Sequence, residues 1–290
     1  MAGTPCCQVI QVAGHRLDEQ WERKRNRHKM VKMDPETRYM SMAVLEQTPN
    51  SLILAVACSD GSIRLFSVSE VSRHIELLSE SFHHQRCVLS VSTCCLEDTK
   101  VQVRWRCRHA LLFSAATDGE IAVWNFSSLS TSNQFSSSPI FTFPAHQSGV
   151  NSLDVNPIKL NDLYHITVSS GGDDGQLTVS NIKIQFGKNS ANSDLQNQLS
   201  VSLENKFSIQ FAHAAPLTSL KFLNKKQIVS TSCDQRVCLW RVGSAGISHQ
   251  RAVCSHVADA AALAVWEDKF CGQGLQLIRV RNDQGEMGNK

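Results

Sequence analysis

The clearest pattern along the chain is an alternation of apolar and polar positions that follows an Asp-Gly turn and recurs four times. A period of two is typical of β-strands, whose successive side chains point to opposite faces. Asp-Gly between two such runs favours a tight hairpin, because glycine adopts positive φ freely. The pattern puts these residues on one face of their strands: Ile63, Leu65, Ile121, Val123, Leu177, Val179, Val237 and Leu239.

The turns recur at a regular distance, which indicates a repeat architecture. Their acidic residues are 58, 56 and 60 residues apart and are Asp60, Asp118, Asp174 and Asp234; in the last turn Gln replaces Gly. A second series consists of four histidines, three of them between successive turns and one after the last turn. Each histidine has apolar residues four and seven positions later. Its members are His84, His146, His213 and, most faintly, His256.

These repeats resemble those of the WD40 family, in which each repeat builds a four-stranded blade of about 40–45 residues in a β-propeller. The resemblance implies an all-β fold. It also implies a buried hydrogen-bond chain of His, Ser or Thr, turn Asp and strand Trp within a blade. The residues at these positions are His84, Ser114, Asp118 and Trp124 in the second blade, and His213, Ser230, Asp234 and Trp240 in the fourth.

The first and third blades depart from this pattern. The first has Val56 and Phe66 at the Ser and Trp positions, and the third has Ser180 at the Trp position. We therefore expect these two blades to be less rigid, and Asp60 to contribute less to stability than Asp118 or Asp234.

Strand-like runs predict four blades from about residue 37 to 255 and a partial fifth, with strands at 260–266, 269–271 and 275–280. Two polar stretches, 127–138 and 187–202, have the composition of loops and lengthen the repeats. Propellers typically close with about 4–8 complete blades. We therefore expect the chain to be part of a larger multi-propeller protein, or a short isoform of one.

The positive charge is concentrated ahead of the first blade. Residues 16–38 hold eight Lys or Arg against five Asp or Glu, which accounts for the whole net charge of +3. Helix propensity is high up to Asp34-Pro35, where a helix must end. A solvated linker helix, a nuclear localisation signal and a surface for nucleic-acid phosphates all stay open. The candidate RNA or partner contacts are Arg23, Lys24, Arg25, Arg27 and Lys29.

The expected organisation is a linker with a basic helical segment at 1–36, propeller blades at 37–280 and a disordered tail at 281–290. The longest apolar run, Leu52–Cys58, is a buried strand and is too short to span a membrane. The N-terminus has no pattern of a signal peptide, so we expect a cytoplasmic protein without membrane contact. The eleven cysteines are scattered without Cys-x-x-Cys, which favours reduced structural thiols such as Cys58, Cys233 and Cys238 in apolar runs.

The candidate chemistry does not indicate an enzyme. Ser, His and Asp of one blade are explained by the repeat, and no Gly-x-Ser-x-Gly, His-Glu-x-x-His or phosphate-binding loop is present in the sequence. The pair His83-His84 is one repeat histidine with a neighbour, and the sequence alone places no further metal ligands beside it. We expect no catalytic, cofactor or metal site.

A closer resemblance rests on residues 15–40 and on the motifs Phe82-His-His, Ser114-Ala-Ala-Thr-Asp-Gly119 and Cys271-Gly-Gln-Gly-Leu275. They resemble the C-terminal region of WD-repeat accessory subunits of FtsJ-type ribose 2′-O-methyltransferases. The resemblance implies a non-catalytic scaffold that positions tRNA for methylation at nucleotide 34, while the partner enzyme supplies the S-adenosylmethionine chemistry. That family is also associated with a serine/threonine kinase and autophagy control, although no motif here carries the association. The alternative is a WD40 protein–protein scaffold in signalling without an RNA role.

Overall fold

The computed structural model shows an all-β chain over the residues it describes. These are 37–47, 50–69, 71–96, 109–126, 138–160, 163–186, 199–254, 260, 262–266, 269–272 and 276–279. Within these ranges all strand pairing is antiparallel, and no helix long and apolar enough to cross a membrane is found.

The strands form five sheets, each pairing its strands in chain order. The first is β1 (Tyr39–Gln47), β2 (Ser51–Cys58), β3 (Ser62–Ser69) and β4 (His74–Phe82). The second is β5 (Val88–Leu96), β6 (His109–Ala116), β7 (Glu120–Asn125) and β8 (Phe141–Pro144). The third is β9 (Val150–Leu160), β10 (Leu163–Gly172), β11 (Leu177–Phe186) and β12 (Leu199–Ile209). The fourth is β13 (Leu217–Asn224), β14 (Gln227–Ser232), β15 (Arg236–Gly243) and β16 (Gly246–Cys254), and the fifth is β17 (Leu263–Trp266), β18 (Lys269–Gly272) and β19 (Gln276–Arg279).

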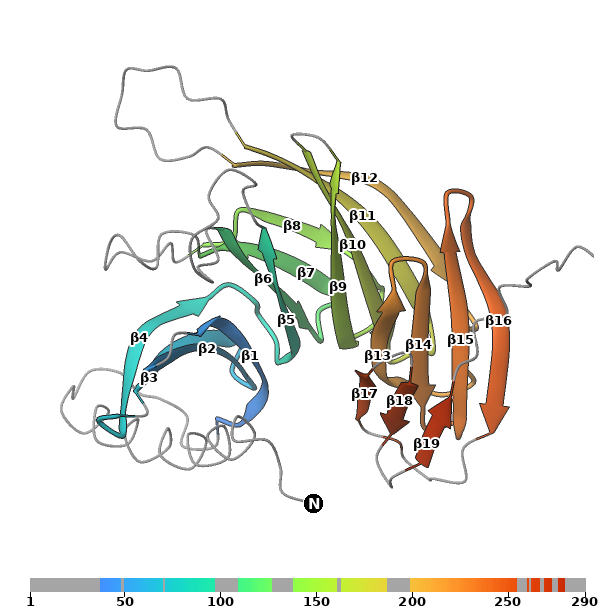
Figure 1. The fold of residues 1–290 in the computed structure, drawn as a ribbon, viewed down its shortest axis with the longest axis horizontal. Helices are drawn as coiled ribbons and strands as arrows, with labels where there is room; N and C mark the ends of the chain where they lie inside the picture. The colour runs from blue at the N-terminus through green and yellow to red at the C-terminus, as the bar shows by residue number, and fades with distance from the viewer. Residues whose placement is uncertain are drawn as a thin grey trace, which may run out of the picture.

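The sheets follow one another along a curved row, from the blue first sheet to the red fifth (Figure 1). The first strand of each sheet contacts the first strand of the next, so that β1, β5, β9, β13 and β17 form the inner side of the row. Four blades and a three-stranded fifth sheet are therefore present, as the repeats predicted. We refer to the four complete sheets as the first to fourth blades.

A blade in the middle of the row buries both faces of its strands. On β7, Ile121 and Val123 pack with Ile166 of the third blade. Trp124, on the opposite face of the same strand, packs with Leu65 of the first blade. The sequence pattern predicted one apolar face, and the structure shows two, because each blade lies between two neighbours.

The predicted Asp-Gly turns are present, and each of them reaches the next blade. Gly61, Gly119 and Gly175 have φ of 86°, 83° and 77°, and Gln235 takes the equivalent place with φ of 62°. The Gly119 carbonyl accepts the backbone N–H of His146 at 3.1 Å, and a Cβ on Gly119 would overlap the His146 carbonyl. The turn of one blade thus fixes the histidine loop of the blade that follows.

Three expectations need correction. The polar stretch 187–202 is not loop throughout, because β12 begins at Leu199 and its residues pair with β11. Cys233 is a free thiol as expected, but it is exposed at the β14–β15 turn and is not packed in an apolar run. Cys95 is disulfide-bonded and therefore not reduced. Cys58 and Cys238 are buried and free, and burial raises the pKa of each thiol to about 11.

The predictions for 1–36, for His256 and for the tail at 281–290 lie outside the described residues.

Polar contacts join the inner strands of the third and fourth blades. One carboxylate oxygen of Asp154 on β9 accepts the Phe222 backbone N–H on β13 at 2.8 Å. The other oxygen accepts the Lys221 ammonium at 2.8 Å. The Asp154 side chain is largely covered, whereas that of Lys221 is half-exposed. We therefore expect the hydrogen bond to the Phe222 backbone to stabilise the fold more than the ion pair with Lys221 does.

Asp154→Ala should lower the free energy of unfolding by about 1–3 kcal/mol, because it leaves the Phe222 amide without its acceptor. Lys221→Met should cost less than about 1 kcal/mol, because it removes only a partly exposed ion pair. Urea unfolding of both variants measures the two costs, and equal costs would contradict this ranking.

Candidate functional site

The second blade contains a chain of polar side chains from four places in the fold, all of them buried except Asp118, which is partly exposed. His84 lies in the loop before β5, Ser114 on β6, Asp118 in the turn before β7, and Trp124 on β7. Trp124 Nε1–H donates to Ser114 Oγ at 2.9 Å, and Ser114 Oγ lies 2.9 Å from His84 Nε2. His84 Nδ1 lies 3.4 Å from Asp118 Oδ2. The structure thus brings together the four residues that the motif positions selected.

The chain of donors fixes the state of the imidazole. A neutral histidine has one N–H and one lone pair, and a proton on Nδ1 of His84 faces the Asp118 carboxylate as a donor. Nε2 then accepts the Ser114 hydroxyl, whose oxygen accepts the indole N–H. Every polar atom of the chain is satisfied in this arrangement, which is what a buried polar group requires.

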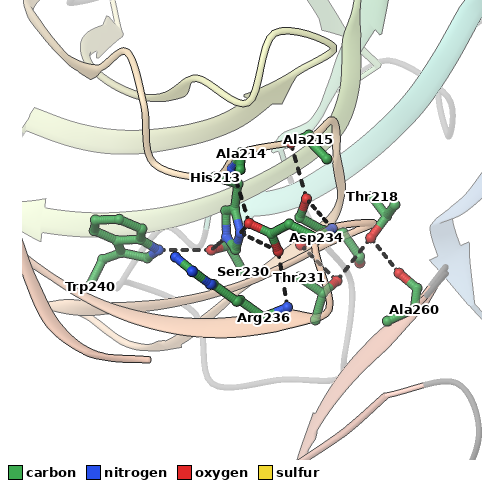
Figure 2. A network of polar contacts seen from close by, with 12 residues as sticks. His213, Ala214, Ala215, Thr218, Ser230, Thr231, Asp234, Arg236, Trp240 and Ala260 are labelled. Atoms are coloured by element: carbon green, nitrogen blue, oxygen red, sulfur yellow. Dashed lines mark hydrogen bonds and ion pairs between the residues drawn. The ribbon is translucent and has the colours of Figure 1, made fainter. Parts of the chain in front are cut away.

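The fourth blade repeats the chain with shorter contacts (Figure 2). His213 Nδ1 lies 3.0 and 3.1 Å from the two Asp234 oxygens, and His213 Nε2 lies 2.7 Å from Ser230 Oγ. Trp240 Nε1–H donates to Ser230 Oγ at 2.8 Å. Asp234 also accepts the backbone N–H of Ala214 and of Arg236, at 3.0 and 2.9 Å.

Burial governs the protonation of these groups. Burial lowers the pKa of His84 and of His213, whereas the negative charges of Asp118 and Asp234, respectively, act to raise it. Burial alone would raise the pKa of Asp234, but the backbone N–H groups and His213 hold it below its ordinary value. In the fourth blade the favoured state is a neutral His213 beside an ionised Asp234.

The Ser, His and Asp side chains have the composition of a hydrolase triad but not its exposure. The hydroxyls of Ser114 and Ser230 are fully buried, and each already accepts an indole N–H. A nucleophile must reach its substrate beside an oxyanion hole. Both networks therefore hold the blades together and offer no route to acyl transfer.

The third blade has only part of the network. His146 Nε2 lies 2.8 Å from Ser170 Oγ, but Nδ1 is buried and has no hydrogen-bond partner among the described residues. Ser180, at the Trp position, likewise has a buried hydroxyl without a partner in that part of the chain. Burial lowers the pKa of His146 to about 4, although the Asp174 charge acts in the opposite direction.

The first blade replaces the network with ion pairs that the motif did not indicate. Arg64 on β3 is fully buried, and its guanidinium donates to Asp60 at 2.8 Å and to Glu80 on β4 at 2.7 Å. Asp60 also accepts the backbone N–H and hydroxyl of Ser62. The expectation that Asp60 contributes less to stability than Asp118 or Asp234 is therefore revised, because its carboxylate neutralises a buried cation. The one available signal was Arg64 itself, a charge inside a strand pattern.

Two exposed phenylalanines occupy equivalent places ahead of the complete networks. Phe82 ends β4 two residues before His84, and Phe211 follows β12 two residues before His213. Their side chains are 61% and 88% exposed. Exposed aromatic residues are enriched at protein interfaces, and sequence reasoning missed both. The basic candidates Arg23, Lys24, Arg25, Arg27 and Lys29 lie outside the described residues.

Comparison with protein families gives a match to the family described as WD domain, G-beta repeat, at residues 137–179 and 205–241. Each match begins around the outer strand of one blade and ends in the third strand of the next. The second blade lies largely outside the match although its network is complete. Its His84 and Asp118 are 34 residues apart, against 21 for His213 and Asp234, so the family spacing is stretched there.

Curated relatives resemble nearly the whole chain. The tRNA (34-2'-O)-methyltransferase regulator WDR6 of Homo sapiens is 38% identical over 299 residues, and that of Rattus norvegicus 35% identical over 308 residues. Both alignments cover 95% of this chain but only 26% and 27% of the relatives. The chain thus spans about a quarter of their length.

Among solved structures, the WD40 β-propeller domain of Doa1 superimposes with a TM-score of 0.52 at 19% identity. The match covers 84% of this chain and 66% of that one. At this identity the likeness concerns the fold alone, and it agrees with the row of four-stranded blades.

Asp60→Ala should lower the free energy of unfolding by about 3 kcal/mol, because it leaves the buried Arg64 guanidinium with one anionic partner instead of two. Asp118→Ala should cost about 1–3 kcal/mol, the cost of an unsatisfied buried donor. Adding Arg64→Met to Asp60→Ala should recover part of the stability, since the stranded charge is gone. Thermal melts of the three variants test this, and a larger destabilisation by Asp118→Ala than by Asp60→Ala would contradict it.

Acid should destabilise the third blade through His146. Its pKa is about 4 when folded, below the ordinary value of 6.5, so the unfolded chain binds the proton more tightly. The contribution of the neutral imidazole is fully present above pH 6.5 and disappears as pH falls toward 4, by up to about 1.4 kcal/mol per pH unit. Urea unfolding at several pH values should therefore show a smaller destabilisation by acid in His146→Gln than in the original chain. Parallel pH curves for the two proteins would refute the assignment.

Proposed function

Because two of its blades match the WD40-repeat family and its strands form a row of propeller blades, we propose that this chain is a non-catalytic scaffold that regulates ribose 2′-O-methylation of tRNA at nucleotide 34. The similarity to the tRNA (34-2'-O)-methyltransferase regulators over 95% of the chain carries this proposal. The blades support it, because Ser114 and Ser230 are buried structural hydroxyls. The methyl transfer belongs to a partner enzyme of the FtsJ type, which binds S-adenosylmethionine, and the scaffold acts in the cytoplasm.

The proposed division of labour gives the RNA contact to the basic segment and the partner contact to the blades. Arg23, Lys24, Arg25, Arg27 and Lys29 supply five positive charges within seven residues, which suits tRNA phosphates. Phosphate contacts position an RNA without reading its sequence. The partner enzyme then selects the ribose of nucleotide 34, and this chain holds the tRNA in register.

A scaffold that binds only proteins is the second candidate. The exposed side chains of Phe82 and Phe211 favour it, because large aromatic residues contribute strongly to protein interfaces. Under this alternative the basic segment is a solvated linker, and tRNA contacts only the enzyme. No residue supports a link to a serine/threonine kinase, so none is proposed for it.

Replacing Arg23, Lys24, Arg25, Arg27 and Lys29 with Gln should weaken tRNA binding by a similar factor for different tRNAs. The slope of log K against log salt should become shallower by about 0.7–0.9 for each phosphate that the variant no longer neutralises. The melting temperature should stay unchanged, because the segment precedes the first strand, β1. Filter binding of tRNA at several salt concentrations measures the slope.

A matched variant separates the two candidates. Phe82→Ser with Phe211→Ser leaves the basic segment intact, so tRNA binding should persist while capture of an FtsJ-type methyltransferase weakens. An unchanged salt slope in the Gln variant would move the RNA contact elsewhere. If, in addition, only the Phe variant failed to capture the methyltransferase, the protein-only scaffold would explain both results better.

A further inference from the structure

We propose that the second blade binds a divalent transition metal ion of the zinc class through His84, Asp118, Glu120 and His83. This site goes beyond the proposed regulatory function and does not depend on it. The sequence offered the adjacent histidines alone, and folding brings two carboxylates beside them from the β6–β7 turn and the start of β7.

Three of the four side chains already converge. One ligand atom each from His84, Asp118 and Glu120 lies within 4.8 Å of the others, the one such group among the residues that the structure describes. His84 Nδ1 and Asp118 Oδ2 are 3.4 Å apart. Zn–N and Zn–O bonds of about 2.0–2.2 Å give a tetrahedron whose edges are about 3.3–3.6 Å. The separation therefore fits two ligands of one metal ion.

His83 is the fourth ligand, on the solvent side. Its side chain is 30% exposed, yet its Nε2 atom is covered and has no hydrogen-bond partner among the described residues. That nitrogen lies 3.8 Å from Glu120 Oε2, but His83 is not in the group whose ligand atoms lie within 4.8 Å of one another, so it completes the site only after its ring moves toward the ion. The rings of His84 and Trp124 contact the His83 ring edge-on.

The surroundings supply the outer contacts that metal ligands need. Asp118 binds the metal through Oδ2 while its Oδ1 accepts the Glu120 backbone N–H at 3.0 Å. When Nδ1 of His84 binds the metal, the imidazole proton moves to Nε2 and is donated to Ser114 Oγ, 2.9 Å away. A hydrogen bond from the second nitrogen orients most metal-bound histidines. Metal binding therefore needs one change of tautomer, after which the Ser114 hydroxyl proton no longer has His84 Nε2 as its acceptor.

The other blades lack these ligands, which makes the second blade distinctive. The residue before the network histidine is Ala145 in the third blade and Ala212 in the fourth. The residue two places after the turn Asp is Gln176 in the third blade and Arg236 in the fourth. A histidine and a carboxylate occur together at these two places only in the second blade among the four.

The ligand set also selects the kind of ion. Imidazole nitrogen suits zinc and its transition-metal neighbours, whereas magnesium and calcium prefer oxygen ligands throughout. Two neutral imidazoles and two carboxylates neutralise a divalent ion. Asp118 and Glu120 are only partly covered, so an ion reaches the site from solvent.

Cobalt(II) and zinc titrations of the full chain, stripped of metal and kept in a non-chelating reductant, test the proposal. One equivalent of Co²⁺ should give the visible absorption of a tetrahedral site, without the near-ultraviolet band of thiolate ligation. Zinc at about one hundred times its Kd should raise the melting temperature by about 5 °C. Magnesium should do neither.

The decisive variant is His83→Ala with Glu120→Arg, which gives the second blade the residues that the fourth blade carries. It should melt at the same temperature as the original metal-free chain and should show neither the cobalt spectrum nor the zinc shift. In the converse variant, Ala212→His with Arg236→Glu, cobalt binding should rise to two equivalents. Equal metal binding by the first variant and the original chain, or a thiolate band in both, would assign the metal to cysteines and overturn the proposal.

Discussion

The structure depends on one constraint, that a buried imidazole must have both ring nitrogens satisfied. In the second and fourth blades the histidine meets this constraint by joining the loop before the blade, the second strand and the turn between the second and third strands. An indole on the third strand completes the chain. The histidine loop is thereby fixed against a hairpin that lies 17 or 30 residues further along the chain. The Gly119 carbonyl extends the same constraint to the next blade, because it fixes the backbone of His146.

Only two of the four blades meet this constraint among the described residues, and the other two depart from it in different ways. The fourth blade has the shortest network, and Arg236 follows its turn. The second has the same network with Glu120 after the turn and a second histidine before it, so polar groups gather at its surface. The third leaves one nitrogen of His146 without a described partner. The first abandons the network and neutralises the buried Arg64 with two carboxylates.

The polar groups of the two complete networks are used inside the fold, which agrees with the proposed scaffold role. Serine, histidine and aspartate, the residue types of an acyl-transfer triad, are present, but their side chains hydrogen-bond to one another inside the blades. The surface keeps exposed aromatic residues beside the histidine loops, at Phe82 and Phe211. Binding energy at such a surface comes from burying those side chains against a partner, while the rigid blades keep them in place.

The sequence by itself determined the hairpins, the blade count and the membership of both complete networks. These follow from local patterns: alternation sets the strand faces, Asp-Gly sets the turns, and the repeat places His84 and Trp124 by resemblance to a known family. Only the tertiary structure decided which residues from different strands meet. Arg64 reaches Glu80 because β3 and β4 pair in one register, and Glu120 reaches His83 because the turn folds against the preceding loop. Such contacts depend on register and on the packing of neighbouring blades, neither of which a local pattern encodes.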